Sequence, residues 1–195
     1  MHLFFRIGNL VYKMDLKMKI LVIGPSNSGK TTLANLLAGH STTPAVNYHP
    51  TAGVRILEME RAPPRASRVA GEAPVQIELW DCSGDLRYEK CWSAFRKDLN
   101  GIIFVFDGEN GFADMEIWVK NFAHRTGIAI ANCVTYAHYK NSKPKGNPKP
   151  PKGLERVPLT ETSLENASNI QLVFDRLFGT IYTSMVEGQE KTGGI

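Results

Sequence analysis

The sequence is poor in cysteine, and its few cysteines are not spaced as disulfide or metal sites are. The chain of 195 residues has three, Cys82, Cys91 and Cys133. Their number is odd and no two form a C-x-x-C pair, which argues against a disulfide framework and against a zinc site. The five histidines show no metal-ligand spacing either. We therefore expect reduced thiols in an intracellular protein without a histidine or cysteine metal centre.

Long hydrophobic runs are absent as well. No segment approaches the ~20 consecutive apolar residues that a membrane-spanning helix needs. The apolar residues 1–13 are interrupted by Arg6 and are followed by no small-residue cleavage site, so they do not resemble a signal peptide. Neither Met1 nor Met14 precedes a glycine, and no cysteine lies near the C-terminus, so we expect no lipid anchor.

The chain does contain enough apolar residues for one core. A length of 195 residues with 43% hydrophobic content fits a single α/β domain with one deep ligand cleft. We expect this domain at residues 14–187. Residues 1–13 would form an N-terminal extension, with Met14 as an alternative start, and residues 188–195 a flexible tail.

The net charge of +4 is concentrated in one segment, from Lys140 to Arg156, which is rich in lysine and proline. That composition is typical of a solvated loop. No aromatic side chains are interleaved with these lysines as a platform on which bases stack, so we expect no nucleic-acid partner.

Short β-like runs alternate with helical patterns along the chain. The β-like runs are residues 19–24, 54–60, 75–80, 101–106, 131–136 and 157–162. Apolar residues recur at helical spacing in 115–122 and 166–185, and a further helical pattern follows the first β-like run. This alternation predicts a mostly parallel sheet with helices on both faces. The second and third runs are expected to form a hairpin with a long exposed loop.

The first β-like run leads into Gly24-Pro25-Ser26-Asn27-Ser28-Gly29-Lys30-Thr31, which matches the phosphate-binding pattern G-x-x-x-x-G-K-[ST] at every defined position. A strand before this loop and a helix after it are the context that a P-loop requires. Backbone N–H groups at the helix N-terminus would surround a β-phosphate, and Lys30 would bridge the β- and γ-phosphates. Thr31 would bind Mg²⁺ through its hydroxyl. The expected nucleotide-binding residues of this loop are Asn27, Ser28, Gly29, Lys30, Thr31 and Thr32.

Two later segments carry groups that suit a nucleotide and its metal ion. Asp81 opens the motif Asp81-Cys82-Ser83-Gly84 at the end of the third β-like run, where an aspartate holds Mg²⁺ through water. Gly84 lets its N–H approach a γ-phosphate with no side chain in the way. Thr51 lies between the two motifs, and is either a second hydroxyl for Mg²⁺ or an ordinary residue at the start of a strand.

The order of these motifs, with Trp80-Asp81-x-x-Gly84, resembles the Ras superfamily of small GTPases, especially its Rab-like and Arf-like branches, over nearly the whole chain. The stretches 53–58 and 78–85, followed by Cys91-Trp92, are most similar to the family of Rab-like subunits of intraflagellar transport complex B. The resemblance implies a Ras-like fold with a six-stranded mixed sheet and five helices, GTP or GDP with Mg²⁺ as cofactors, and coiled-coil subunits of that complex as partners. It also implies a cytoplasmic protein of the cilium or flagellum and its basal body.

The base-reading motif of small GTPases, Asn-Lys-x-Asp, is replaced here by Ala137-His138-Tyr139-Lys140. Lys140 cannot accept hydrogen bonds from guanine as an aspartate does, although Lys140 or Tyr139 can stack on the base or bond to it. His138 and Lys140 are therefore expected nucleotide contacts by position. Glu161-Thr162-Ser163-Leu164 resembles the other base-edge motif, which implies backbone contacts from Ser163 and Leu164.

Asp85 occupies the position of the glutamine that orients the attacking water in small GTPases. Its carboxylate would repel the γ-phosphate, so we expect slow or negligible hydrolysis with Asp85 as the candidate catalytic residue. The position fits a solvated loop aspartate equally well. The tryptophans are expected in the core, with Trp92 as an alternative partner contact.

Three functions fit these observations. The first is a nucleotide-stabilised adaptor subunit of the transport complex with slow GTP hydrolysis. The second is a cycling GTPase switch whose segments near Thr51 and from Asp81 to Trp92 respond to the nucleotide. The third is a P-loop kinase for a small substrate, which would need arginines in a lid over the phosphates, and the sequence shows no such lid.

Overall fold

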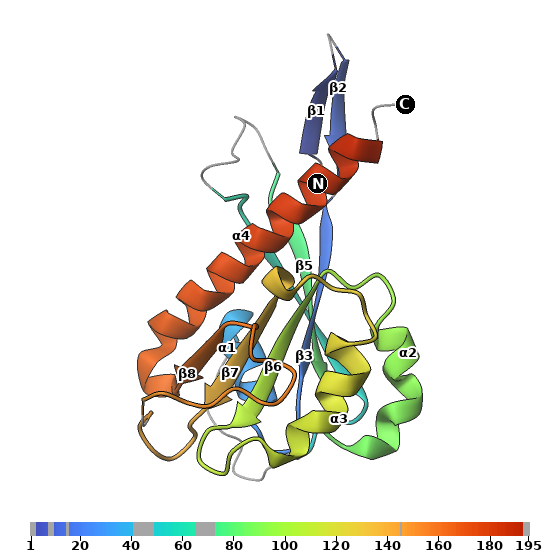
Figure 1. Ribbon diagram of the computed structural model, residues 1–195. Helices are drawn as coiled ribbons and strands as arrows, with labels where there is room; N and C mark the ends of the chain where they lie inside the picture. Colours follow the sequence, from blue (N-terminus) through green and yellow to red (C-terminus); the bar gives the residue numbers. More distant parts are fainter. Residues whose placement is uncertain are drawn as a thin grey trace.

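The computed structural model describes residues 3–7, 10–14, 16–40, 49–64, 73–144 and 146–192. The strands form a two-stranded hairpin and a separate six-stranded sheet, and Figure 1 shows the hairpin set apart from the large sheet. The hairpin consists of β1 (Leu3–Ile7) and β2 (Leu10–Met14). The strands of the large sheet are β3 (Lys17–Ile23), β4 (Val54–Arg61), β5 (Val75–Cys82), β6 (Gly101–Asp107), β7 (Cys133–His138) and β8 (Leu159–Thr162).

The large sheet is mixed, in the order β4-β5-β3-β6-β7-β8. Only the pairing of β4 with β5 is antiparallel. β6 lies inside the sheet and is buried along nearly its whole length, as its uninterrupted apolar sequence predicts. β4 lies at one edge, where polar residues alternate with apolar ones.

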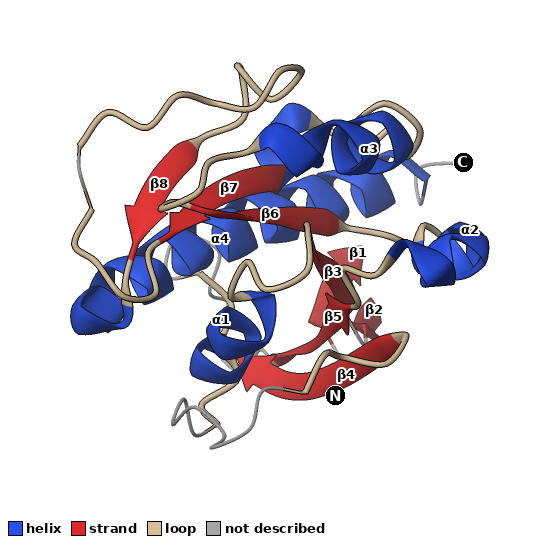
Figure 2. Ribbon diagram, turned by 90° about the horizontal axis from the view of Figure 1, so that it is seen from below, coloured by secondary structure: helices blue, strands red, loops and turns tan. Residues whose placement is uncertain are grey.

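The described residues contain four α-helices (Figure 2). They are α1 (Lys30–Leu37), α2 (Trp92–Phe95), α3 (Glu116–Trp118) and α4 (Ala167–Thr192). A 3₁₀ segment, Leu86–Cys91, precedes α2, and a π-helical turn, Val119–Ala123, continues α3. Short 3₁₀ turns cover Ala113–Met115, Ile130–Asn132 and Leu164–Asn166.

The helix count corrects one expectation, because the family resemblance implies five helices. The segment between β7 and β8 has no helix among its described residues. It contains five prolines, at positions 144, 148, 150, 151 and 158, and proline inside a helix removes a backbone donor and clashes with the preceding turn. Lys145 of this segment and residues 65–72 of the expected hairpin loop lie outside the described residues.

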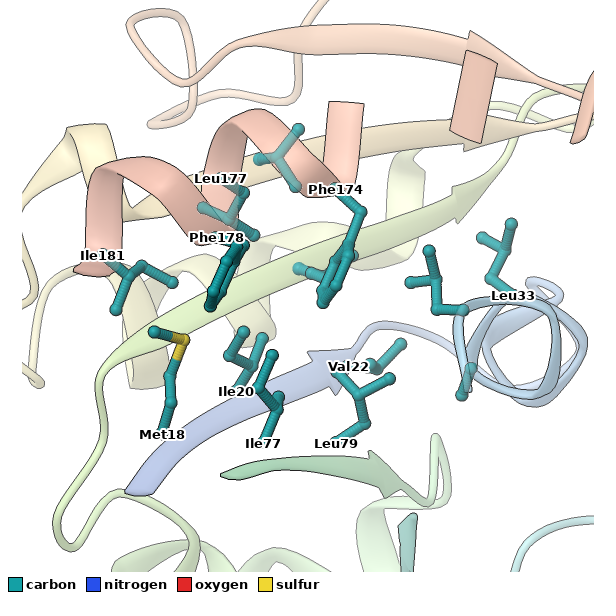
Figure 3. Packing of buried hydrophobic residues seen from close by; sticks show 14 of the residues in the cluster. Met18, Ile20, Val22, Leu33, Ile77, Leu79, Phe174, Leu177, Phe178 and Ile181 are labelled. Atoms are coloured by element: carbon teal, nitrogen blue, oxygen red, sulfur yellow. The ribbon is translucent and has the colours of Figure 1, made fainter. Parts of the chain in front are cut away.

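The two faces of the sheet bury separate apolar clusters. α1 and α4 cover one face, where Phe174 and Leu177 of α4 meet Ile20 of β3 (Figure 3). α2 and α3 cover the other face, where Trp92 packs against Trp118 with ring centroids 4.8 Å apart. Trp92 is only 1% exposed, so the alternative of Trp92 as a partner contact is wrong and its expected place in the core is confirmed.

The six strands of the large sheet and helices α1, α3 and α4 agree with the sequence pattern in type and order, with differences at their ends, whereas strands β1 and β2 were not predicted in the N-terminal extension. α4 continues past Met185, where the pattern predicted its end, to Thr192. The antiparallel pairing of β4 and β5 confirms the expected hairpin. Because β3, β5, β6 and β7 run parallel, their carboxyl ends meet at one edge of the sheet, which is where ligands bind in open α/β folds. No described helix is both long and apolar enough to cross a membrane.

Candidate functional site

The loop between β3 and α1 is folded around glycines that no other residue replaces easily. Gly24 and Gly29 have φ angles of 146° and 89°, in the left-handed region that favours glycine. A Cβ atom on Gly24 would lie 1.9 Å from the carbonyl oxygen of Val105, and one on Gly29 would lie 2.3 Å from the His138 ring. The glycine spacing of the sequence motif therefore follows from close packing against β6 and β7.

Lys30 is the first residue of α1 and its ammonium group is almost completely buried. The side chain is 6% exposed, and Nζ donates a hydrogen bond to the carbonyl of Pro25 at 2.5 Å. Burial lowers the pKa of Lys30 to about 8, although Asp81 opposes this shift. A buried cation at the positive end of a helix favours an anionic ligand, which would stabilise its charge.

Thr31, Thr51 and Asp81 converge although they are far apart in the sequence. The Thr31 hydroxyl donates to Asp81 Oδ2 at 2.8 Å, and the two threonine hydroxyl oxygens are 2.9 Å apart. Asp81 is fully buried, and burial raises its pKa. Its second oxygen, Oδ1, has no hydrogen-bond partner in the described structure.

This arrangement fits a hard divalent cation. A buried carboxylate oxygen without a partner is costly unless an ion or ordered water satisfies it. Among the described residues, no three His, Cys, Asp or Glu side chains form a cluster that would hold a metal by themselves. A cation here would therefore take its other ligands from phosphate and water, as Mg²⁺ commonly does.

Gly84 lies directly against the P-loop. A Cβ atom on Gly84 would come 2.2 Å from the backbone nitrogen of Ser26, so only glycine allows this approach. The neighbouring Ser83 donates its backbone N–H to the carbonyl of Gly53 at 2.8 Å, which ties the end of β5 to the segment that carries Thr51. Tyr48, at the start of that segment, is outside the described residues.

Asp85 is the one expected catalytic residue, and its side chain bonds to Arg87. Its carboxylate accepts hydrogen bonds from the Arg87 backbone N–H at 2.9 Å and from Arg87 Nε at 2.8 Å. These bonds hold the pKa of Asp85 below its usual value. Asp85 does not line the pocket that the P-loop residues form, so its catalytic role stays a prediction.

At the far end of the site, His138 closes the base of the pocket. It is 1% exposed, and its Nδ1 lies 3.1 Å from the Thr162 hydroxyl. Burial, with a smaller contribution from Lys140, lowers the pKa of His138 to about 4. The imidazole is therefore neutral at physiological pH.

Lys140 crosses from the end of β7 to the P-loop. Its Nζ donates to the carbonyl of Asn27 at 2.6 Å and pairs with Asp107 at 2.8 Å. The Lys140 ammonium is thus occupied by protein groups, while its side chain lines the pocket.

These groups surround a pocket of about 360 Å³ at the carboxyl edge of the sheet. Its lining residues are Ser26, Asn27, Ser28, Gly29, Lys30, Thr31, Thr32, Pro50, Thr51, Ser83, Gly84, His138, Lys140, Asn141 and Leu164. Nearly all of the expected nucleotide-binding residues are brought together there. Ser163 and Asp81 are buried and do not line the pocket, although Asp81 accepts a hydrogen bond from the lining residue Thr31.

Sequence reasoning missed Ser26, Pro50, Ser83 and Asn141 as lining residues. All four lie beside residues that the motifs identified, and this proximity was the available signal. Asn141 was not included because the base-reading motif was aligned to end at Lys140.

Comparison with known proteins places the chain among GTPases. Residues 19–138 match the family model "Ras of Complex, Roc, domain of DAPkinase". The chain is 35% identical to the intraflagellar transport protein 22 homologue of Danio rerio over 180 residues, which cover 90% of this chain and 95% of that protein. It is 33% identical to intraflagellar transport protein 22 of Trypanosoma brucei over 197 residues, covering 89% and 90% of the two chains.

Two solved structures of the T. brucei protein are similar to this one. The GTP-bound complex of T. brucei intraflagellar transport proteins 22, 74 and 81 contains a chain that matches with a TM-score of 0.70 at 33% identity, covering 89% of this chain and 99% of that chain. The GDP-bound T. brucei protein matches with a TM-score of 0.60 at 31% identity, covering 88% and 99%.

Proposed function

The chain belongs to the family of intraflagellar transport protein 22, within the Ras-like GTPases, and on this basis we propose that it is a GTP- or GDP-binding adaptor subunit of the intraflagellar transport machinery. The observation that carries the proposal is the buried Lys30 ammonium, which faces a P-loop pocket at the start of α1. A phosphate there would restore the charge balance that burial disturbs.

Mg²⁺ is the proposed second component of the site. The partnerless Asp81 Oδ1 and the hydroxyls of Thr31 and Thr51 supply oxygen donors of the kind that Mg²⁺ prefers. With the nucleotide bound, the ion would neutralise charge between the β- and γ-phosphates, and Thr31 and Asp81 would hold it from the protein side.

The chemistry that these residues perform is mainly binding and orientation. Lys30 and the backbone N–H groups of the P-loop hold the phosphates, and Gly84 leaves space beside Ser26. The carboxylate of Asp85 is engaged by Arg87 and stands away from the pocket, which supports slow hydrolysis. Among the described residues that line the pocket there is no arginine of the kind a P-loop kinase uses, which disfavours a small-substrate kinase.

The partners of the proposed adaptor are coiled-coil subunits of intraflagellar transport complex B, and its location is the cytoplasm and the cilium or flagellum with its basal body. The T. brucei relative supports this proposal because its GTP-bound structure contains the intraflagellar transport proteins 74 and 81.

A substitution at Thr31 tests whether nucleotide and docking are linked. Thr31→Asn removes the hydroxyl that bonds to Asp81 and that we assign to Mg²⁺, so nucleotide affinity should fall about tenfold or more. If docking needs the nucleotide-bound state, binding to the partner subunits should weaken in the same variant. Calorimetric titration with GDP and pull-down of the partner subunits measure the two effects.

Thr180→Asn provides a matched control, because Thr180 is an exposed residue of α4 that does not line the pocket. It should change neither measurement. Unchanged docking in the Thr31 variant would show that the nucleotide is dispensable for the partner interaction.

Single-turnover release of the γ-phosphate separates the adaptor from a cycling switch enzyme. The adaptor predicts slow release, far below the rates of about 5–20 s⁻¹ that assisted small GTPases reach. Release at such rates, alone or with the partner subunits, would refute the adaptor.

A further inference from the structure

The end of the pocket beyond the P-loop has acidic residues nearby, but none lines it. Asp107 pairs with Lys140 at 2.8 Å. Glu161 accepts hydrogen bonds from the Tyr139 hydroxyl at 2.7 Å and from the Gly146 N–H at 2.9 Å. The described lining residues include no carboxylate. A base at this end would therefore be read by a group other than a carboxylate.

Asn141 is a lining residue with a side-chain amide, and Glu109 holds it from outside the pocket. Glu109 Oε1 accepts from the Asn141 backbone N–H at 2.7 Å, and Glu109 Oε2 lies 3.4 Å from Asn141 Nδ2. One carboxylate thus bonds to both donors of the same residue. These bonds hold the pKa of Glu109 below its usual value.

The contact with Glu109 orients the amide. An asparagine side chain carries a donor nitrogen and an acceptor oxygen on opposite arms of a planar group. Nδ2 is turned toward Glu109, so Oδ1 is turned away from it, and Asn141 is one of the residues that line the pocket. A rotated amide would place Oδ1 against the Glu109 carboxylate, which is electrostatically unfavourable.

We propose that Asn141 Oδ1 is the acceptor that reads the N–H edge of guanine, and that Glu109 is the positioning residue that fixes its orientation. This inference rests on the proposed function, which supplies the nucleotide. Guanine presents two donors on this edge, at N1 and at its 2-amino group. One amide oxygen accepts from N1–H, whereas a carboxylate has oxygens for both donors.

The proposal predicts how the affinities for guanine, hypoxanthine and adenine nucleotides compare. Adenine has no hydrogen on N1 and leaves Asn141 without a donor, so it binds more weakly. Hypoxanthine keeps N1–H and lacks only the 2-amino group, so it binds nearly as well as guanine. Since a hydrogen bond to a neutral acceptor is weaker than one to a carboxylate, the preference for guanine over adenine is about tenfold, well below that of a site with a carboxylate.

Nucleoside diphosphates test this without hydrolysis. We expect full-length protein with Mg²⁺ to bind GDP and IDP within about threefold of each other, and ADP about tenfold more weakly, by calorimetric titration. Asn141→Ala should weaken GDP and IDP together and leave ADP unchanged. Asn141→Asp, combined with Glu109→Gln to remove the carboxylate that would face it, should strengthen GDP more than IDP, because the second carboxylate oxygen is then free to accept from the 2-amino group.

Asn147→Asp, also combined with Glu109→Gln, is the charge-matched control. Asn147 is exposed on the same loop and does not line the pocket, so this variant adds the same negative charge without an acceptor at the base. The ratio of GDP to IDP affinity should stay at the wild-type value. A ratio that rises equally in both variants would show a general charge effect and overturn the role of Asn141.

The positioning role of Glu109 is tested by non-additivity. Glu109→Ala should lower GDP and IDP affinity as Asn141→Ala does, and the double variant should bind no more weakly than either single variant. Glu109→Gln keeps an acceptor for the Asn141 N–H and should restore part of the affinity. Additive losses would overturn the positioning role, since they would mean that Glu109 acts independently of Asn141.

These measurements separate a failure of nucleotide binding from a failure of base reading by Asn141. If the wild-type protein binds no nucleoside diphosphate, the proposed function fails. If GDP binds and Asn141→Ala leaves the GDP, IDP and ADP ratios unchanged in a variant with native circular dichroism, only the reading by Asn141 fails.

Discussion

The ring of His138 is packed between the P-loop and β8, where it lies against Gly29 and bonds to Thr162. Its pKa of about 4 is below the unperturbed value, so the folded protein binds this proton less readily than the unfolded chain does. The contribution of neutral His138 to the stability of the fold is therefore fully present above about pH 6.5. It is lost as the pH falls through 4.

His138→Asn should remove this part of the acid sensitivity. Between pH 7 and pH 4, the wild type should lose about 3 kcal/mol of unfolding free energy more than the variant, because a shift of one pKa unit corresponds to about 1.4 kcal/mol. Urea unfolding at a series of pH values measures the difference. The exposed His124 gives the control, and His124→Asn should keep the wild-type slope. Identical slopes for the His138 variant and the wild type would contradict the assignment.

Asp85→Gln tests whether the carboxylate retards hydrolysis. A neutral amide neither repels the γ-phosphate nor forms the ion pair with Arg87, so it is free to orient water. We expect single-turnover γ-phosphate release to accelerate about tenfold. Glu89→Gln, an exposed substitution in the same 3₁₀ segment, should leave the rate unchanged. If the Asp85→Gln variant releases phosphate no faster than the wild type, Asp85 does not limit hydrolysis.

At the scale of elements, α4 depends on one apolar face for its place on the sheet. Phe174, Phe178 and Ile181 are buried against β3 and β5 (Figure 3). Leu172 of the same helix is 49% exposed. The helix repeat of 3.6 residues places these side chains on different faces.

Two alanine substitutions on α4 should therefore differ sharply. Phe174→Ala leaves a cavity between the helix and the sheet and should lower the unfolding free energy by about 3–5 kcal/mol. Leu172→Ala removes an exposed side chain from the same helix and should change it by less than about 0.5 kcal/mol. Urea unfolding measures both. Similar losses for the two variants would contradict the packing of α4.

The loop between β7 and β8 shows how an element can be lost while the site is retained. Its prolines exclude the helix that the family resemblance implies, yet its first residues, Lys140 and Asn141, line the pocket. The anchoring contacts come from Asp107 and Glu109 at the end of β6, and they do not need a helix behind them.

At the scale of the whole molecule, the pocket joins segments from several strand ends, so a ligand there should stabilise the complete fold. Ligand at one hundred times its dissociation constant adds about 2.7 kcal/mol of stability. For a domain of this size, that free energy raises Tm by about 5–10 °C.

Thermal unfolding with GDP and Mg²⁺ measures this stabilisation. Adding EDTA should reduce the shift, because Asp81 and Thr31 then lose the ion that links them to the phosphates. Asp81→Asn should make the remaining shift insensitive to EDTA. A Tm that GDP does not change would contradict nucleotide binding in this pocket.

Much of the fold was predictable because its signals are local. β6 is uninterruptedly apolar and buried, and the P-loop has glycines where the backbone takes positive φ. The end of α4 was predicted less well, since residues after Met185 continue the helix without the apolar pattern that marked its earlier turns. The missing helix after β7 shows that family resemblance is weaker evidence than the prolines of this chain.

The sequence by itself determined the class of fold and the phosphate-binding loop, and it made Lys30, Thr31 and Asp81 the candidates for binding phosphate and Mg²⁺. These features were readable because strand and helix periods and glycine spacing are fixed by neighbouring residues. Only the tertiary structure decided the rest. It paired Lys140 with Asp107 and brought Asn141 to the pocket with Glu109 behind it. These outcomes depend on which distant side chains meet at the carboxyl edge of the sheet, and packing and charge pairing settle them only once the chain is folded.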